Sequence, residues 1–340
     1  MKARRAELVV VYEDVDVSSS IAEYLTSFSY SDAGSGTLDD LQLTLEDRHQ
    51  LWQGDWMGKK GDTITAAIRT VNWNKAGEAQ LLICGTFEVD GMSSSGPPDV
   101  LNIKAVSIPF DSNVRFEKKT RAWEKVKLST LAKDIAKNAG YKLVFELTDD
   151  PEYDRVDQTD QSDLAFLLER AKNEGVGMKV TDGQIVLFDE LVYEQQGPVA
   201  EIARGAGRVL SYSFEDNMAD ASYVACQVAY QEPRSKKTVT HTYRPPGAPT
   251  KGPVLKINER FASIKEADRI GRKRLREKNK NAVKASLKLP GDVRLVTTAT
   301  VTLAGWKNFD GKYIIESSKH DVGGSGYTTS LELRKVLEGY

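Results

Sequence analysis

The strongest constraint on this chain is the alternation of apolar and polar residues in short segments near both of its ends. Leu41, Leu43 and Leu45, for example, alternate with polar residues. Because successive residues of a strand point to opposite faces, this period of two predicts strands with one buried face. The same period recurs at residues 64–68, 87–89, 101–105, 224–230, 283–289, 299–303, 313–315 and 331–333. The first hundred residues and the last third are therefore predicted to be β-rich.

Between the two β-rich regions, the apolar residues change to helical spacing. Residues 128–138 place their apolar side chains on one face, with Ser129 as the expected N-cap. Residues 163–173 follow Ser162, a second expected N-cap, and a glycine stops each segment. Short strands are expected beside these helices at residues 141–145 and 185–188. The middle of the chain is thus predicted to form a small α+β domain.

A third helix is predicted over residues 263–280, where Ser263 and Glu266 form a capping-box pattern. It follows a proline- and glycine-rich connection at residues 245–253, which cannot continue a central strand. The fold class is therefore a β-rich α+β multidomain protein. Its predicted parts are a first β-barrel-like tube domain at residues 1–110, a small α+β domain at 111–195, and a second, related β-barrel-like tube domain at 196–340 with a helical insertion at 263–280.

A weak internal repeat relates the two β-rich regions. Gly61-Asp62 matches Gly291-Asp292, and the spacing from Gly85 through Phe87 to Val89 matches that from Gly311 through Tyr313 to Ile315. A glycine that admits positive φ would precede a strand whose aromatic residue lies on the packed face. Two interpretations stay open, because glycine-aromatic strand starts also arise by coincidence in β proteins. If the repeat is real, three chains could present six similar positions around an axis.

Overall composition argues against several classes of protein. The 340 residues include 47 basic and 49 acidic ones, so the net charge of −2 gives no general attraction to nucleic acid or anionic lipid. Cys84 and Cys226 lie far apart and are expected to be buried thiols of a protein made in a reducing compartment. The N-terminus lacks a signal-peptide core, and no apolar run approaches the roughly 20 residues of a membrane span. We therefore expect cytoplasmic synthesis without stable membrane insertion.

The sequence predicts no catalytic, cofactor-binding or metal-binding residue and no small-molecule substrate. The histidines, at positions 49, 241 and 320, lie outside any zinc-ligand spacing. The acidic run at residues 149–154 lacks the calcium-loop pattern and is expected to be a solvated turn. The glycine-containing stretch at residues 204–207 is too short for a phosphate loop.

The densest charge lies between Lys265 and Lys288, where ten basic residues accompany three acidic ones. This segment carries +7, so the remainder of the chain carries −9. Such a helix could contact phosphates, but without interleaved aromatic residues a protein-contact helix is the preferred interpretation and DNA the weaker alternative. The candidate contact residues on the helix are Lys265, Arg269, Arg272, Lys273, Arg274, Arg276, Lys278 and Lys280.

Two passages carry a resemblance to a known family. The first is the run from Val156 to Ala171, and the second begins at Gly311 and ends at Leu333. They resemble the baseplate hub proteins of contractile phage tails, the late control protein D family, most closely its branch from defective Bacillus-type prophage elements. They are also similar to the hub part of VgrG-type spikes. The motif residues, to which the resemblance gives structural roles, are Gln158, Ser162, Asp163, Phe166, Leu167, Gly311, Tyr313, Gly326 and Tyr327.

The resemblance implies a homotrimer whose barrel domains form a pseudo-sixfold ring. That ring would join the tail tube, or a tube-initiator protein, to the central spike and contact other baseplate proteins. The chain would be a structural protein of a virion or phage-tail-like particle, with spike and cell-wall activities on other polypeptides. Two alternatives stay open at this point: a nucleic-acid-binding protein that uses residues 265–288, and a tail-associated cell-wall hydrolase. The sequence does not distinguish an infectious phage from a bacteriocin or a secretion device.

Overall fold

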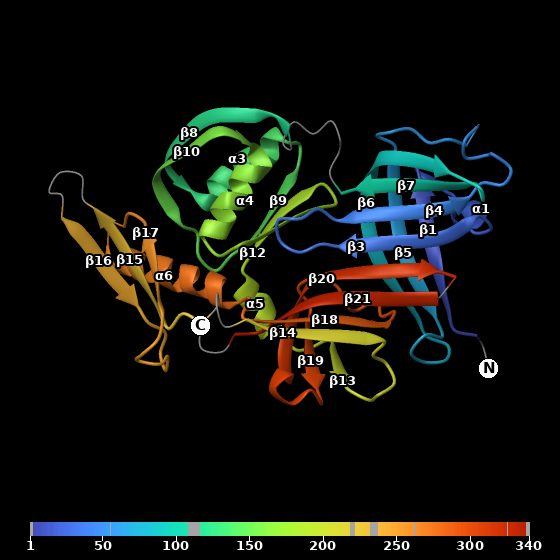
Figure 1. Ribbon diagram of the computed structural model, residues 1–340. Coiled ribbons are helices and arrows are strands. Elements are labelled where there is room, and N and C mark those ends of the chain that lie inside the picture. The colour runs from blue at the N-terminus through green and yellow to red at the C-terminus, as the bar shows by residue number, and fades with distance from the viewer. Residues whose placement is uncertain are drawn as a thin grey trace.

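The computed structural model describes residues 3–54, 56–107, 116–217, 222–231, 237–261, 263–324 and 326–337. Strands dominate it, as the sequence predicts, and most of them belong to one 13-stranded sheet. Figure 1 shows a smaller α+β unit beside this sheet and a second small unit, formed by a three-stranded sheet and one helix, at the far end of the molecule. None of the described helices is both long and apolar enough to cross a membrane.

The first β unit is formed by the N-terminal strands around one core. Phe28, Leu41, Ile68 and Phe87 are among its fully buried residues. The strands predicted around residues 41–45, 64–68, 87–89 and 101–105 are confirmed. Its elements are β1 (Arg5–Tyr12), β2 (Val15–Asp16), α1 (Ser18–Ile21), β3 (Leu25–Asp32), β4 (Asp40–Glu46), β5 (Thr63–Val71), β6 (Ala79–Ser95) and β7 (Val100–Val106).

The second β unit has its own core and continues the same sheet. Strand β20 pairs with β3 from Ser318 to Gly323, so the two units share a ladder. The core includes Leu287, Val301, Tyr313 and Leu331. Its elements are β13 (Ala200–Ala203), β14 (Ser211–Asp216), β18 (Val283–Pro290), β19 (Thr300–Ala304), η1 (Lys307–Phe309), β20 (Gly311–Gly323) and β21 (Gly326–Lys335).

The internal repeat extends from the motifs to the strand order. Five strands run β5-β6-β7-β4-β3 across the first β unit and β19-β20-β21-β18-β14 across the second. The matched aromatics, Phe87 and Tyr313, are both buried. The register also shifts at the same place, after Val89 in β6 and after Ile315 in β20. A chance match of short motifs would not reproduce both topology and bulge, so the two units are related.

The middle unit packs two helices against short strands. Both helices have the predicted bounds, and Ser162 Oγ caps the second by accepting from Ala165 N. The expectation for Ser129 was wrong: Lys127 is the N-cap, and Ser129 instead donates from N and Oγ to Asp150. The elements are β8 (Lys118–Lys127), α3 (Leu128–Asn138), β9 (Lys142–Glu146), β10 (Glu152–Ser162), α4 (Asp163–Asn173), β11 (Gly177–Thr181), β12 (Gln184–Phe188) and, beyond them, α5 (Glu190–Gln195).

The insertion in the second β unit is larger than the predicted helix. That helix is present as α6 (Ile264–Asn279), but it covers a separate sheet of β15 (Ala225–Gln231), β16 (Thr238–Tyr243) and β17 (Val254–Asn258). The strand expected at residues 224–230 therefore lies outside the 13-stranded sheet. The physical reason is burial, because the apolar face of α6 needs a partner and finds it in Cys226 and Val228. The exact domain boundaries stay predictions.

Candidate functional site: the charged junction around the basic helix

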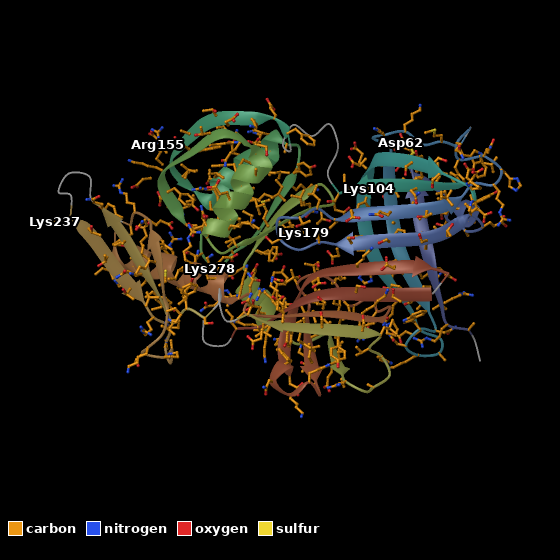
Figure 2. All side chains as sticks on the ribbon, viewed as in Figure 1. Asp62, Lys104, Arg155, Lys179, Lys237 and Lys278 are labelled. Carbon is orange, nitrogen blue, oxygen red and sulfur yellow. The ribbon has the colours of Figure 1, made fainter. Side chains whose placement is uncertain are left out.

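The basic helix turns most of its charge toward the rest of the chain. α6 lies between its own sheet and the middle unit (Figure 1). Lys265, Arg272 and Lys278 are exposed, and Figure 2 labels the last of them on this helix. The other five candidate residues pair with carboxylates of this chain; they are Arg269, Lys273, Arg274, Arg276 and Lys280. Most of the basic side chains that a phosphate backbone could contact are therefore already paired with carboxylates of this chain.

The N-terminal part of α6 is docked on the end of α4. Glu174 follows α4 and is buried, and it accepts from Arg269 Nη1 and, at 3.1 Å, from Lys273 Nζ. The hydroxyl of Tyr153 also donates to Glu174 Oε1, at 3.1 Å. Burial together with the neighbouring Glu174 raises the pKa of Tyr153, so its hydroxyl remains a donor. Arg274 extends the contact by donating to Asn173 Oδ1 at 2.8 Å.

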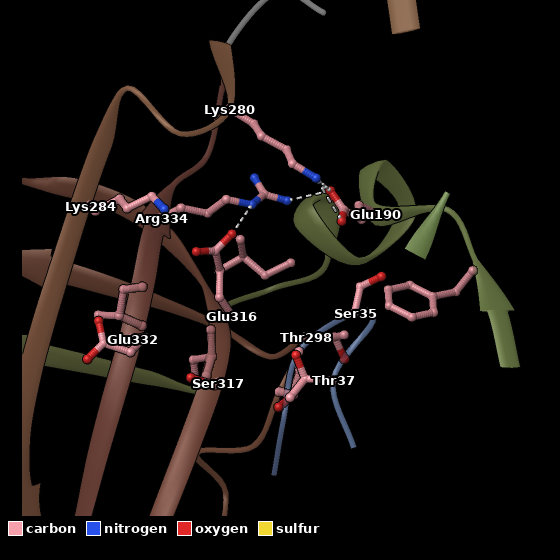
Figure 3. Close-up of a pocket in the computed structure, with 16 residues that line it drawn as sticks. Ser35, Thr37, Glu190, Lys280, Lys284, Thr298, Glu316, Ser317, Glu332 and Arg334 are labelled. Atoms are coloured by element: carbon pink, nitrogen blue, oxygen red, sulfur yellow. Dashed lines mark hydrogen bonds and ion pairs between the residues drawn. The ribbon is translucent and has the colours of Figure 1, made fainter. Parts of the chain in front are cut away.

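The C-terminal part of α6 enters a buried cluster of charges at the second β unit. Glu194 of α5 lies 2.6 Å from Arg276 Nη2 and 2.5 Å from Nη1 of Arg334, a residue of β21. Glu190, one turn earlier in α5, lies 2.9 Å from Arg334 Nη2 and 3.2 Å from Lys280 Nζ. Figure 3 shows Arg334 reaching between Glu190 and Glu316. The cluster joins three elements that are far apart in the sequence.

The repeat bulge supplies the last carboxylate of this cluster. Glu316 lies at the register shift of β20, and Arg334 Nε is 3.2 Å from its Oε1. A bulge turns the side chain of its extra residue out of the regular alternation. This geometry explains how an acidic residue in the middle of a strand reaches a buried arginine.

The pKa values of two members of the cluster, Glu190 and Arg334, are shifted in the direction that keeps them charged near neutral pH. Burial by itself would raise the pKa of Glu190, but Lys280 and Arg334 outweigh it and hold this pKa below its ordinary value. Burial would likewise lower the pKa of Arg334, but Glu190 and Glu194 hold it above its ordinary value. Opposite charges at these distances stabilise one another in a low-dielectric surrounding. Glu190 and Arg334 are therefore held in their charged forms as partners in this ion cluster.

A pocket of about 420 Å³ opens beside this cluster. Its lining includes Glu190 and Arg334 together with Ser35 and Thr37 from the loop after β3, so the first β unit also reaches this point (Figure 3). The described part of the chain gathers no three His, Cys, Asp or Glu residues that could hold a metal ion. The ion pairs of this cluster hold α5 and α6 against β21 of the 13-stranded sheet.

The motif residues of the middle unit form a second buried polar network. Asp163 is fully buried and pairs with Arg121 Nη2 at 2.6 Å and Lys119 Nζ at 3.0 Å. Gln158, also fully buried, donates to Asp163 Oδ1 at 2.9 Å. Phe166 has no exposed surface and stacks on Trp123, and Leu167 beside it is equally buried. These residues fix the start of α4 against β8 and β10.

The motif residues of the second β unit are turn glycines and packed tyrosines. Gly311 and Gly326 adopt φ of 136° and 92°, a region that favours glycine. Tyr313 is fully buried, and its hydroxyl donates to the Phe309 carbonyl at 2.8 Å. Tyr327 is buried as well, and its hydroxyl oxygen lies 2.7 Å from His320 Nδ1.

His320 is a fully buried packing residue whose protonation state the geometry defines. Its Nε2 lies 3.1 Å from the Leu295 carbonyl, which can only accept, so Nε2 carries the proton and Nδ1 accepts from Tyr327. Burial lowers the pKa of His320 to about 4 despite the carboxylate of Asp32. The imidazole is therefore neutral in the folded protein.

Sequence reasoning missed the contact that joins the middle unit to the first β unit. Lys179 of β11, which Figure 2 labels, pairs with Asp32 and, at 3.2 Å, with Asp39. Asp32 also accepts from Thr297 N at 2.7 Å, which brings in the second β unit. Burial raises the pKa of Asp39 to about 6, although Lys179 opposes this rise. No sequence signal marks these residues, because each is a single charge in or beside a different strand: Lys179 lies within β11, Asp32 ends β3 and Asp39 directly precedes β4.

The fold of this chain is shared with solved tail proteins and with a chain of a VgrG complex. The solved tail protein from Neisseria meningitidis MC58 aligns with a TM-score of 0.72 at 12% identity, with 97% of each chain covered. A chain of the solved Francisella PdpA–VgrG complex aligns with a TM-score of 0.58 at 7% identity, covering 98% of this chain and 58% of that one. At these identities the likeness is one of fold.

The family follows from the sequence itself. Residues 114–326 match the family described as phage tail baseplate hub (GPD), and the chain belongs to this family. A protein of Escherichia phage 186 named "Probable baseplate hub protein" is 23% identical, over 95% of this chain and 91% of that protein. The resemblance drawn from the two sequence passages is thereby confirmed, and the chain is a baseplate hub protein of a phage tail or tail-like particle.

Proposed function

We propose that this hub protein acts as a homotrimer, in which six related β units form a ring between the tail tube and the central spike. The repeat supports the proposal, because both β units share a strand order and a bulge. The pairing of β3 with β20 joins the two units in one sheet, which would give a two-part segment of such a ring. Tube, tube-initiator, spike and other baseplate proteins would be the partners, and synthesis would take place in the bacterial cytoplasm.

We assign the contact between copies to an apolar patch on the outer face of the first β unit. Leu81 and Ile83 of β6 are 56% and 67% exposed. Ile83 pairs across the ladder with Ala67, and Ala67 with Val9, so these residues share one face. Burial of such a patch removes apolar surface from water and stabilises association.

The test is the mass in solution, measured by light scattering over a range of concentrations. A chain of 37.7 kDa makes a trimer easy to separate from a monomer. Leu81→Asp combined with Ile83→Asp is expected to shift the protein to monomers, whereas Ile264→Asp, at a position 68% exposed on α6, should leave the mass unchanged. A wild-type protein that stays monomeric at every concentration, alone and with the spike protein added, would contradict the ring.

We further propose that the chain is structural and not an enzyme, and that DNA is not its partner. The internal ion pairs of α6 support the second point, since five of its cations already have carboxylate partners. Zymography on peptidoglycan and gel retardation of DNA at low salt test the two points. A cleared band would establish a hydrolase, and retardation that weakens steeply with salt would restore the nucleic-acid alternative.

A further inference from the structure

A groove lies between the two β units, away from the charged junction. It has a volume of about 910 Å³ and is lined by Arg4 and Trp73 of the first β unit and by β13 of the second. Leu289 and Leu295, both core residues, contribute apolar lining. A cavity of this size matches the upper range of ligand pockets, so a short peptide segment could occupy it.

The groove meets β13 along the edge of the strand. All residues from Pro198 to Ala203 line it. Because consecutive strand residues point to opposite faces, a groove that touches every one of them is not confined to a single face, and it also reaches Thr302 of the paired strand β19. β13 pairs with β19 on one side, and none of the other described strands pairs with its second side. An unpaired edge offers backbone N–H and C=O groups to an incoming strand.

One arginine of the groove holds β13 in place. Arg294 makes a bidentate ion pair with Asp292, at 2.9 Å from Nε to Oδ1 and 2.6 Å from Nη2 to Oδ2. Its Nη1 donates to the Val199 carbonyl at 3.2 Å, just before β13 begins. The charges of Arg294 and Asp292 thus offset each other and fix the edge strand.

Two other arginines line the groove and give it positive charge. Arg4 lies 4.6 Å above the ring of Trp73, and Arg208 is exposed. Within the described ranges, neither has a carboxylate within ion-pair distance, and Glu201 is the one acidic lining residue outside the Arg294 pair. Cations that flank a free strand edge favour an incoming segment that carries carboxylates.

We propose that this groove binds an extended acidic peptide segment of another protein as an additional strand on β13. Backbone pairing along the edge would supply affinity, and carboxylates directed at Arg4 and Arg208 would supply selectivity. About six residues, at roughly 3.3 Å each, would span the lined part of the strand. The inference stands on this geometry and does not require the hub to be a trimer.

Fluorescence anisotropy of a labelled probe peptide, Thr-Val-Asp-Val-Glu-Val-Thr, tests the proposal on the full chain. We expect saturable binding that is lost when alternate backbone nitrogens of the probe are methylated or when its two acidic residues are replaced by lysine. Arg4→Glu combined with Arg208→Glu should weaken binding about tenfold. Lys278→Glu, an exposed charge on α6, is the matched control and should bind as wild type does.

A second variant separates loss of the groove from loss of the fold. Ala206→Trp places a large side chain at an exposed lining position and should abolish probe binding with no change in circular dichroism. Absence of saturable binding up to about 1 mM, or equal binding of the methylated probe, overturns the proposal. The proposal is also overturned if the wild-type protein does not bind the probe and the double arginine variant has a lower solution mass than wild type. In that case the groove would bind a second copy of this chain.

Discussion

Replacement of Arg334 by methionine should destabilise the protein strongly, because it removes the cation shared by three carboxylates. The Arg334 side chain is 2% exposed and lies within 3.2 Å of Glu190, Glu194 and Glu316. Breaking a buried ion pair by removing one partner costs about 3–5 kcal/mol. Glu190 keeps Lys280, and Glu194 keeps Arg276. We therefore expect the lower end of that range, about 3 kcal/mol.

Urea unfolding followed by circular dichroism measures this loss, with the free energy extrapolated linearly to water. Arg155→Met is the control, because the Arg155 side chain and its partner Asp157 are 59% and 51% exposed, and a solvent-exposed pair of this kind contributes little to stability. Arg334→Lys should recover part of the stability, since one ammonium cannot replace a guanidinium that reaches three carboxylates. The reasoning fails if Arg334→Met unfolds at the wild-type urea concentration, or if Arg155→Met loses as much.

Two further predictions concern single buried residues. Phe166→Ala should cost about 3–5 kcal/mol, because the ring is fully buried against Trp123; an unchanged melting temperature would contradict this. His320 has a folded pKa of about 4 against an ordinary 6.5, so its contribution of about 3 kcal/mol is present above pH 6.5 and lost as the pH falls toward 4. The raised pKa of Asp39 has the opposite effect, because its protonation stabilises the folded protein as the pH falls. The measurement is therefore the difference in unfolding free energy between wild type and His320→Gln at each pH. A pH-independent difference would refute the assignment.

The local structure of this chain could be predicted from the sequence because it depends on neighbouring residues. The period of two located most strands of both β units, although it did not mark β3, β13 or β14, and helical spacing gave α3 and α4 their bounds. Ser162 and Ser263 cap helices as expected, since capping requires only a side-chain oxygen within one turn. Ser129 was misjudged because Asp150, 21 positions away, takes its hydrogen bonds.

The family and the repeat were also accessible from the sequence, since both rest on the order of residues along the chain. The motifs that begin at Gly85 and Gly311 indicated a repeat, although the sequence left coincidence as an alternative. The structure added the common strand order and the bulge that places Glu316 against Arg334.

The partners of charged residues and of strands were decided by the tertiary structure alone. The basic helix presents a charge of fixed sign and spacing, but the sequence cannot say whether Arg276 meets a phosphate, another protein or Glu194, 82 positions away. Alternation likewise assigns a buried face to β15 without naming what covers it. A residue pattern records which surfaces must be satisfied, whereas only the path of the folded chain brings the groups that satisfy them within contact distance.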